Sequence, residues 1–505
     1  MRALASLVLV IAACGPSHRG NGGDDDDTGD GGTDAEPPNL CKVQSDESGI
    51  GMCDQVAPPG SFEPELQWAW NGPPGETYSI VTPLVANLTD DNNDGVIDLC
   101  DSPEVVVVAG GASGGQPGQA GHIFLLDGKT GTMELRFPTI VDNTVTPALG
   151  DLDHDGVPEI VTVDQAGRLY AFSNTGAVKF GPAGMWAGDH YSGAIALADM
   201  DHDGEVEIIG GNTVFDHTGA VKWTANAPQA TWNASTVADL DGDGFQELVL
   251  GAAAFHYDGT LYWNTNLAGG YPQVANLDDD PEPEVLLTNT SGLSLMNHDG
   301  TIKFQDLRPT GVAAGGTTWI RPATIHDFDG DGKAEFAMSS SSFYTLYNQN
   351  GTIKWSTPVS DSSGIAAGTA FDFLGDGTAE AMYADEQFLF VFGPTGAPLF
   401  SMPRTSGTLS EYPVVADIDN DGSAEIVVVS NTLSGTPSPT VQVIRDKMDR
   451  WIQARRIWNQ HTYHVTNVRE DGTIPQYEQK SWQRLNTFRT NAQISGSGVC
   501  QPPIL

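Results

Sequence analysis

Short apolar runs alternate with acidic loops along most of the chain. The stretch 146–181 shows the pattern: an apolar run ends in the loop DLDHDGVPE, a second run follows at 160–163 and a third at 168–173, and a glycine turn leads into a fourth run ending in an aromatic residue. Short runs of this kind, bounded by Gly, Asp and Asn, predict β-strands.

The same unit recurs eight times. The loops begin, in chain order, at Asp90, Asp151, Asp199, Asp239, Asn276, Asp327, Asp372 and Asp417, between 37 and 61 residues apart. A repeat of about 45 residues with four short strands is typical of a β-propeller blade. We therefore predict an all-β propeller of eight blades, with a seven-bladed ring as the alternative. The segment Glu65–Trp70 resembles the last strand of a blade and could close the ring against the final unit.

The acidic loops carry the candidate chemistry. In the loop 151–159, carboxylates stand at positions 1, 3, 5 and 9, and the glycine at position 6 supplies the turn that lets them converge. Several hard oxygen ligands suit Ca²⁺ better than Mg²⁺ or Zn²⁺. An EF-hand would place an acid at position 12, where this loop has Thr162. We expect the ion to clamp the strands rather than to catalyse; the alternative is that some loops are only Asx turns.

The loops and their flanking strands resemble the FG-GAP/VCBS repeats of integrin-α-like propellers over roughly residues 63–450. This resemblance implies calcium ligands, and five loops carry the complete set: Asp151, Asp153, Asp155 and Glu159; Asp199, Asp201, Asp203 and Glu207; Asp239, Asp241, Asp243 and Glu247; Asp327, Asp329, Asp331 and Glu335; Asp417, Asp419, Asp421 and Glu425.

Three loops depart from that set. The first offers Asp90, Asn92, Asp94 and Asp98 and has an insertion before Glu104; the fifth offers Asn276, Asp278, Asp280 and Glu284, with Pro281 replacing the glycine; the seventh keeps Asp372, Asp376 and Glu380 but has Leu374 at position 3. We expect up to eight Ca²⁺ ions, with the seventh site weak or empty.

The chain is strongly acidic, with 66 Asp and Glu against 23 Lys and Arg and a formal net charge of −43. Such a charge argues against a nucleic-acid backbone as the partner. The loops account for part of the acidity, and metal ions would neutralise part of it.

The N-terminus reads as an export signal. In residues 1–13, Arg2 precedes an apolar run too short to span a bilayer. Ile11–Cys14 resembles a bacterial lipobox, which implies cleavage before Cys14 and a lipid on its thiol; the alternative is an ordinary signal peptide. With Gly15 next, the same resemblance favours the outer membrane. Residues 14–62 would then hold the lipid site, a Gly/Asp-rich tether and the Cys41/Cys53 segment.

Four cysteines follow Cys14: Cys41, Cys53, Cys100 and Cys500. An even number in an exported chain indicates two disulfides, for which three pairings exist. We favour Cys41 with Cys53 and Cys100 with Cys500.

Residues 446–505 differ from the propeller region, 63–445, because they are rich in Arg and aromatic residues and lack the acidic loop. We favour a cap that packs on the propeller, its Arg side chains pairing with the excess acids. A platform for sugar or peptide is the alternative. His461 and His464 would be a metal pair only with a third ligand, which the sequence does not place.

The favoured function is a monomeric, calcium-stabilised surface or adhesion protein that binds a glycan or a protein partner through the propeller face. The pocket at the ring's axis is where the ligand is expected. Some rhamnogalacturonan lyases resemble this architecture, so a polysaccharide-degrading enzyme is an alternative, although the propeller region is poor in Lys and Arg. A structural component of the envelope is the third possibility. No H-E-x-x-H zinc motif or phosphate-loop motif is present.

Overall fold

The computed structural model describes residues 41–43, 51–52, 55–111, 118–226, 234–278, 280–308, 321–361, 365–431, 437–483, 485–494 and 500–501. The chain divides into two units, Met1–Pro38 and Asn39–Leu505, and every described residue belongs to the second. No helix in these described ranges is long and apolar enough to cross a membrane.

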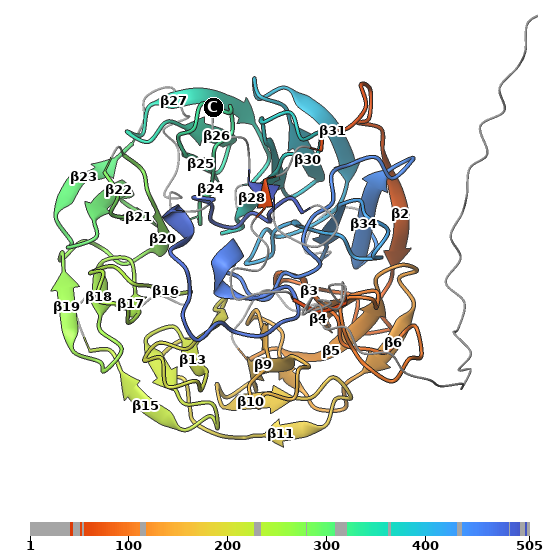
Figure 1. Ribbon diagram of the computed structural model, residues 1–505, viewed down its shortest axis with the longest axis horizontal. Coiled ribbons are helices and arrows are strands. Elements are labelled where there is room, and N and C mark those ends of the chain that lie inside the picture. The colour runs from red at the N-terminus through yellow and green to blue at the C-terminus, as the bar shows by residue number, and fades with distance from the viewer. Residues whose placement is uncertain are drawn as a thin grey trace, which may run out of the picture. The chain divides into compact units, whose positions relative to one another are not determined.

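The second unit is a ring of eight antiparallel sheets, which we number as blades 1–8 (Figure 1). Their strands are β3 (Leu84–Ala86), β4 (Glu104–Gly110), β5 (Ala120–Asp127) and β6 (Met133–Arg136) in blade 1; β8 (Ala148–Gly150), β9 (Glu159–Val163), β10 (Leu169–Phe172) and β11 (Val178–Phe180) in blade 2; β12 (Ile195–Ala198), β13 (Glu207–Gly210), β14 (Thr213–Phe215) and β15 (Val221–Thr224) in blade 3; and β16 (Thr236–Ala238), β17 (Glu247–Val249), β18 (Ala253–Phe255) and β19 (Leu261–Asn264) in blade 4.

The other half of the ring repeats this order. The strands are β20 (Tyr271–Ala275), β21 (Glu284–Asn289), β22 (Gly292–Asn297) and β23 (Ile302–Leu307) in blade 5; β24 (Thr324–His326), β25 (Glu335–Ser339), β26 (Phe343–Tyr347) and β27 (Ile353–Pro358) in blade 6; β28 (Gly368–Phe371), β29 (Glu380–Ala384), β30 (Phe388–Phe392) and β31 (Pro398–Pro403) in blade 7; and β32 (Val414–Ala416), β33 (Glu425–Val429), β34 (Val441–Asp446) and β2 (Pro64–Trp70) in blade 8. The prediction of eight blades is confirmed.

Five short elements lie outside the blade order among the described residues. β7 (Val141–Asp142) pairs with β5, and β1 (Gly51–Met52) pairs in parallel with β35 (Cys500–Gln501). Two 3₁₀ turns, η1 (Val465–Asn467) and η2 (Ser481–Gln483), belong to the C-terminal segment.

Blade 8 closes the ring with strands from both ends of the chain. β2 pairs antiparallel with β34, from Pro64 opposite Asp446 to Trp70 opposite Val441. The predicted role of the ELQWAW segment is therefore confirmed. The strand β2 thereby covers the edge of β34 and links the two ends of the chain within one sheet.

Burial falls from the axis to the rim within each blade. In blade 2, every residue of β9 is buried, whereas β11 has no buried residue. In Figure 1, first strands such as β24 and β28 lie near the centre and fourth strands such as β19, β23 and β27 lie at the rim. The core therefore fills the space between neighbouring sheets.

A repeated contact joins each of blades 1–7 to the blade before it in the ring. The glycine in the turn between the third and fourth strands lies against a side chain of the preceding blade, in most cases an aromatic ring. Such pairs are Trp68–Gly131, Phe137–Gly176, Phe180–Gly219, Trp223–Gly259, Trp263–Gly300, Leu307–Gly351 and Trp355–Gly396. A Cβ atom at Gly259 would lie 2.9 Å from the Trp223 ring, so only glycine allows this approach.

The C-terminal segment crosses the middle of the ring, where it contacts first strands of several blades (Figure 1). Val85 of β3 forms a β-bridge with Trp458, Leu149 of β8 donates its N–H to the carbonyl of Asn459, and Ile325 of β24 forms a bridge with Phe488. The segment thus ties distant blades together at the axis.

The arginines of this segment only partly follow the expectation of ion pairing. Arg456 pairs with Glu470, and Arg450 pairs with Asp446. The buried Arg455 donates to the carbonyls of Val465 and Val468, and Arg489 donates to the carbonyl of Ala323. Backbone carbonyls buried at the axis need donors, which these guanidinium groups supply.

We predict that Gly259→Ala will destabilise the ring more than Gly60→Ala. Both glycines have a left-handed φ, +83° and +80°, but a Cβ at Gly60 meets nothing within 4 Å. The conformational penalty of about 1 kcal/mol is common to both, and the clash with Trp223 should add about 2 kcal/mol at Gly259. Denaturant unfolding at a fixed calcium concentration measures the difference; equal losses would contradict the packing role.

Candidate metal sites in the blade loops

The acidic loops follow the first strand of each blade, and their own acids fold them. We number positions from the first acid. The carboxylate at position 5 accepts the N–H of position 7 in all eight loops, at 2.8–3.2 Å. The first acid also accepts the N–H of the position-6 glycine in six loops, where this glycine has a left-handed φ. These turns bring the carboxylates together.

A glutamate begins the second strand of every blade and fastens it to the first strand. Its Oε2 atom accepts the backbone N–H of the second residue after the first strand, as between Glu159 and Leu152 at 2.8 Å. The same bond is made by Glu104, Glu207, Glu247, Glu284, Glu335, Glu380 and Glu425. The sequence suggested only a ligand role for the glutamates at position 9, so this structural role was missed.

In blade 1 the fastening residue is Glu104, which accepts the N–H of Leu88 at 2.6 Å. The predicted ligands Asp90, Asn92, Asp94 and Asp98 therefore lie in an insertion between Leu88 and Glu104. Asp101, which the sequence did not suggest, organises this insertion: its carboxylate accepts the N–H groups of Asp91, Asn92 and Asp98.

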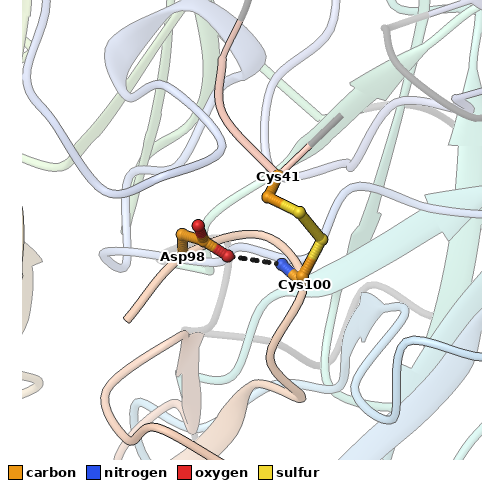
Figure 2. A group of neighbouring side chains, drawn as sticks. All are labelled: Cys41, Asp98 and Cys100. Carbon is orange, nitrogen blue, oxygen red and sulfur yellow. Dashed lines mark hydrogen bonds between the residues drawn. A yellow bond between two sulfur atoms is a disulfide. The ribbon is translucent and has the colours of Figure 1, made fainter. Parts of the chain in front are cut away.

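The insertion is also held by a disulfide that the sequence did not predict. Cys41 is bonded to Cys100, with 4.9 Å between their Cα atoms (Figure 2). Asp98 accepts the N–H of Cys100 at 3.0 Å, and Leu99 donates its N–H to the carbonyl of Cys41. The favoured pairings of Cys41 with Cys53 and of Cys100 with Cys500 are therefore wrong, because the folded insertion, rather than proximity in sequence, sets the partner. Cys53 lies outside the described residues.

Lysines from the fourth strands reach into four of the loops. In blade 3, the Lys222 Nζ lies 2.9 Å from Asp201 and 2.8 Å from Glu207. Equivalent contacts join Lys179 to Asp153 and Glu159, Lys303 to Asp278 and Glu284, and Lys354 to Asp329 and Glu335. In blade 4, His256 lies 3.0 Å from Glu247. The repeated Lys-aromatic pair in AVKF, AVKW, TIKF and TIKW was the available signal.

Burial makes the charge on these glutamates costly. It raises the pKa of Glu207 to about 7 even though Lys222 opposes the shift. Burial alone would lower the pKa of Lys222, but its bonds to Glu207 and Asp201 outweigh that effect and raise it. The lysine ammonium therefore offsets part of the cost of ionising a buried carboxylate.

Blades 7 and 8 have no such lysine. Leu399 stands at the lysine's place in blade 7, where Leu374 already replaces the third-position acid, and burial raises the pKa of Glu380 to about 8. In blade 8 the place is taken by Gln67 of β2, whose amide donates to Asp419 at 2.8 Å.

The loops of blades 2, 3 and 8 fit a hard cation on a direct observation. Each has buried carboxylate oxygens without a hydrogen-bond partner among the described residues: Asp151 Oδ1, Asp199 Oδ1, Asp201 Oδ1, Asp419 Oδ1 and Glu425 Oε1. Oxygens of Asp151, Asp153 and Glu159 lie within 4.8 Å of one another, as do those of Asp199, Asp201 and Glu207. A buried anionic oxygen without a partner is unfavourable, and a divalent cation would satisfy it.

The other predicted ligand sets also lie in their loops. Among the described residues, these loops have no buried carboxylate oxygen without a hydrogen-bond partner, so the case for a metal is weaker. In blade 5, Asn276 donates its amide to the carbonyl of Asp280. Lys480 of the C-terminal segment pairs with Asp239 in blade 4. His464 pairs with Glu478, and His461 is buried against Tyr271 and Tyr412, so the two histidines do not converge on a shared partner.

The C-terminal segment crosses the middle of the ring, where the axial pocket was expected. At the loop end, a cavity of about 50 Å³ remains between blades 6 and 7 and the C-terminal segment, room for water molecules rather than a sugar. At the opposite end, the ion pairs Arg321–Asp361 and Arg404–Glu411 are fully buried.

Two stretches of the chain match family models. Residues 151–210 match the FG-GAP-like repeat, and residues 231–262 match the FG-GAP repeat. No curated protein matches the sequence.

Several solved structures share the arrangement of most of the chain. The Vibrio cholerae biofilm matrix protein Bap1 has a TM-score of 0.72 at 19% identity, covering 89% of this chain and 100% of that one. The exotype rhamnogalacturonan lyase YesX has a TM-score of 0.53 at 16% identity, covering 89% and 83%. The Bacillus licheniformis rhamnogalacturonan lyase PL11 has a TM-score of 0.50 at 17% identity, covering 91% and 83%. At these identities the similarity establishes the fold alone.

We predict that Lys222→Met will destabilise the protein in a pH-dependent way in EDTA buffer. The folded-state pKa of Glu207, about 7, lies above the ordinary 4.5, so ionisation of Glu207 costs stability as the pH rises through this range. Without the ammonium that cost grows by about 1–2 kcal/mol at pH 8, and this added cost nearly disappears at pH 5. Lys447→Met, at an exposed lysine, is the control for net charge. A loss that does not depend on pH would contradict the pairing.

Proposed function

Because the chain is a β-propeller with FG-GAP repeats, we propose that it is an exported, calcium-stabilised binding protein of the cell surface that recognises a glycan or a protein partner. The observation that carries this proposal is the closure of the ring. Both chain ends contribute to blade 8, and the C-terminal segment contacts first strands around the axis. Such a ring is a rigid platform, and rigid platforms suit recognition by the loops that they hold.

The similarity to Bap1 supports the same reading. That protein is a biofilm matrix protein, and its arrangement matches this chain more closely than the two lyases do. The disulfide between Cys41 and Cys100 supports export, since disulfides persist in oxidising compartments.

Calcium enters this proposal as a structural ion. The loop carboxylates would hold it, and the ion would supply the positive charge that their unpartnered buried oxygens need. Each bound ion would stabilise the folded ring by mass action, without a part in any reaction.

Polysaccharide cleavage is the second candidate, favoured by the two rhamnogalacturonan lyases with the same arrangement. The purified protein should bind a glycan or protein partner on arrays in Ca²⁺ and release no product. Release of unsaturated oligosaccharides from rhamnogalacturonan, detected by ultraviolet absorbance, would overturn the binding function in favour of the enzyme. The absence of both binding and cleavage would favour a structural component of the envelope.

The lipid anchor gives a separate prediction. Cys14→Ala should abolish metabolic labelling with palmitate and move the protein from the membrane fraction to the soluble one, because the thiol that would carry the lipid is gone. Cys41→Ala is the matched control: it removes the disulfide but should keep the label. A Cys14→Ala protein that stays in the membrane fraction would contradict the anchor.

A further inference from the structure

The loop of blade 8 is the place where three remote parts of the chain meet. Gln67 of the closing strand β2 donates to Asp419. Asn420 donates to the carbonyls of Leu99 and Asp101 in the blade 1 insertion. From the C-terminal segment, Gln453 donates to Asp417 at 2.8 Å. Anything that fixes this loop therefore acts on the closure of the whole ring.

The same loop holds four acids whose negative charge is not offset by a direct ion pair among the described residues; Arg456, Lys129 and Arg445 act on it only from a distance. Asp417 and Glu425 are fully buried, and Asp419 is 8% exposed. Among the described residues, no Lys, Arg or His forms a salt bridge with these three or with Asp421, unlike the loops of blades 2, 3, 5 and 6. Where those blades place a lysine, the closing strand places the neutral Gln67.

Three oxygens of this site are buried without a hydrogen-bond partner. They are Glu425 Oε1, Asp419 Oδ1 and Gln67 Oε1. Buried anions without partners are not tolerated unless a cation pairs with them.

We propose that one Ca²⁺ ion, held by Asp417, Asp419, Asp421 and Glu425, makes the closure of the ring at blade 8 depend on metal, whereas the lysines of blades 2, 3, 5 and 6 stand in for part of that charge in their own loops. This inference rests on the calcium binding in the proposed function. It adds that blade 8 depends on the ion more than the lysine-bearing blades do. Oxygen ligands in this number suit Ca²⁺.

The ion acts on β2 through Gln67 and Asp419. With the ion bound, the Asp419 carboxylate keeps its charge and its place, and the Gln67 amide keeps its acceptor. Without the ion, repulsion among the four acids loosens the loop, and β2 loses a side-chain contact that supplements its backbone pairing with β34.

Hydrogen exchange of the β2 and β34 amides, with and without Ca²⁺, tests the proposal directly. At a free Ca²⁺ concentration ten times the Kd, amide exchange that requires a local opening with release of the ion should become about tenfold slower. Glu425→Gln, which keeps the shape of the side chain, should abolish this protection, while Asp199→Asn in the lysine-bearing blade 3 should leave it intact. Mg²⁺ serves as the control ion.

Gln67→Lys is the decisive second variant. It places an ammonium where the other blades have one, so β2 should be protected in EDTA and the melting temperature should respond less to Ca²⁺ than in the unsubstituted protein. This variant also keeps the test valid if Glu425→Gln fails to fold.

The outcomes separate the two proposals. Calcium binding by calorimetry with no change in β2 exchange would overturn the metal-dependent closure and leave metal binding standing. Retained protection in Glu425→Gln would also overturn it. If neither calorimetry nor the melting temperature detects Ca²⁺, the calcium part of the proposed function fails as well.

Discussion

A buried glutamate carboxylate begins the second strand of every blade, and the loop around it is arranged to satisfy its charge. One oxygen of each accepts a backbone N–H from the end of the first strand, so the fold fixes the side chain in place. The other oxygen then needs a partner, and the blades meet this need differently. Glu207 has Lys222, Glu247 has His256, and Glu425 has no protein cation among the described residues. The blades share one backbone plan but differ in where positive charge comes from.

Much of the ring could be predicted because its signals are local. Eight framed loops gave eight blades, and the apolar alternation of residues 65–70 gave the closing strand. The lysines were not predicted because each comes from the fourth strand of its blade, about 20 residues after the acidic loop that it contacts, as Lys222 does. The disulfide was missed because its partners meet only after the blade 1 insertion folds. The path of residues 446–494 depends on contacts with many blades, and no local pattern encodes such a path.

The C-terminal segment crosses the middle of the ring, where a ligand pocket was expected. Arg455 and Arg489 are buried at the axis and serve backbone carbonyls, so these cations are committed to the structure. The fully buried ion pairs at the other end are similarly committed to each other. The recognition that we propose would therefore use the surfaces around the ring and its loops, which differ from blade to blade more than the strands do.

The disulfide between Cys41 and Cys100 also determines how the molecule carries mechanical load. β2 lies between these two cysteines along the chain, inside the covalent loop that they close. A pulling force applied to the chain before Cys41 passes through the sulfur bridge into blade 1 and bypasses β2. The hydrogen bonds between β2 and β34 are thereby shielded from peeling, and the ring stays closed under tension that would unzip an unbridged strand.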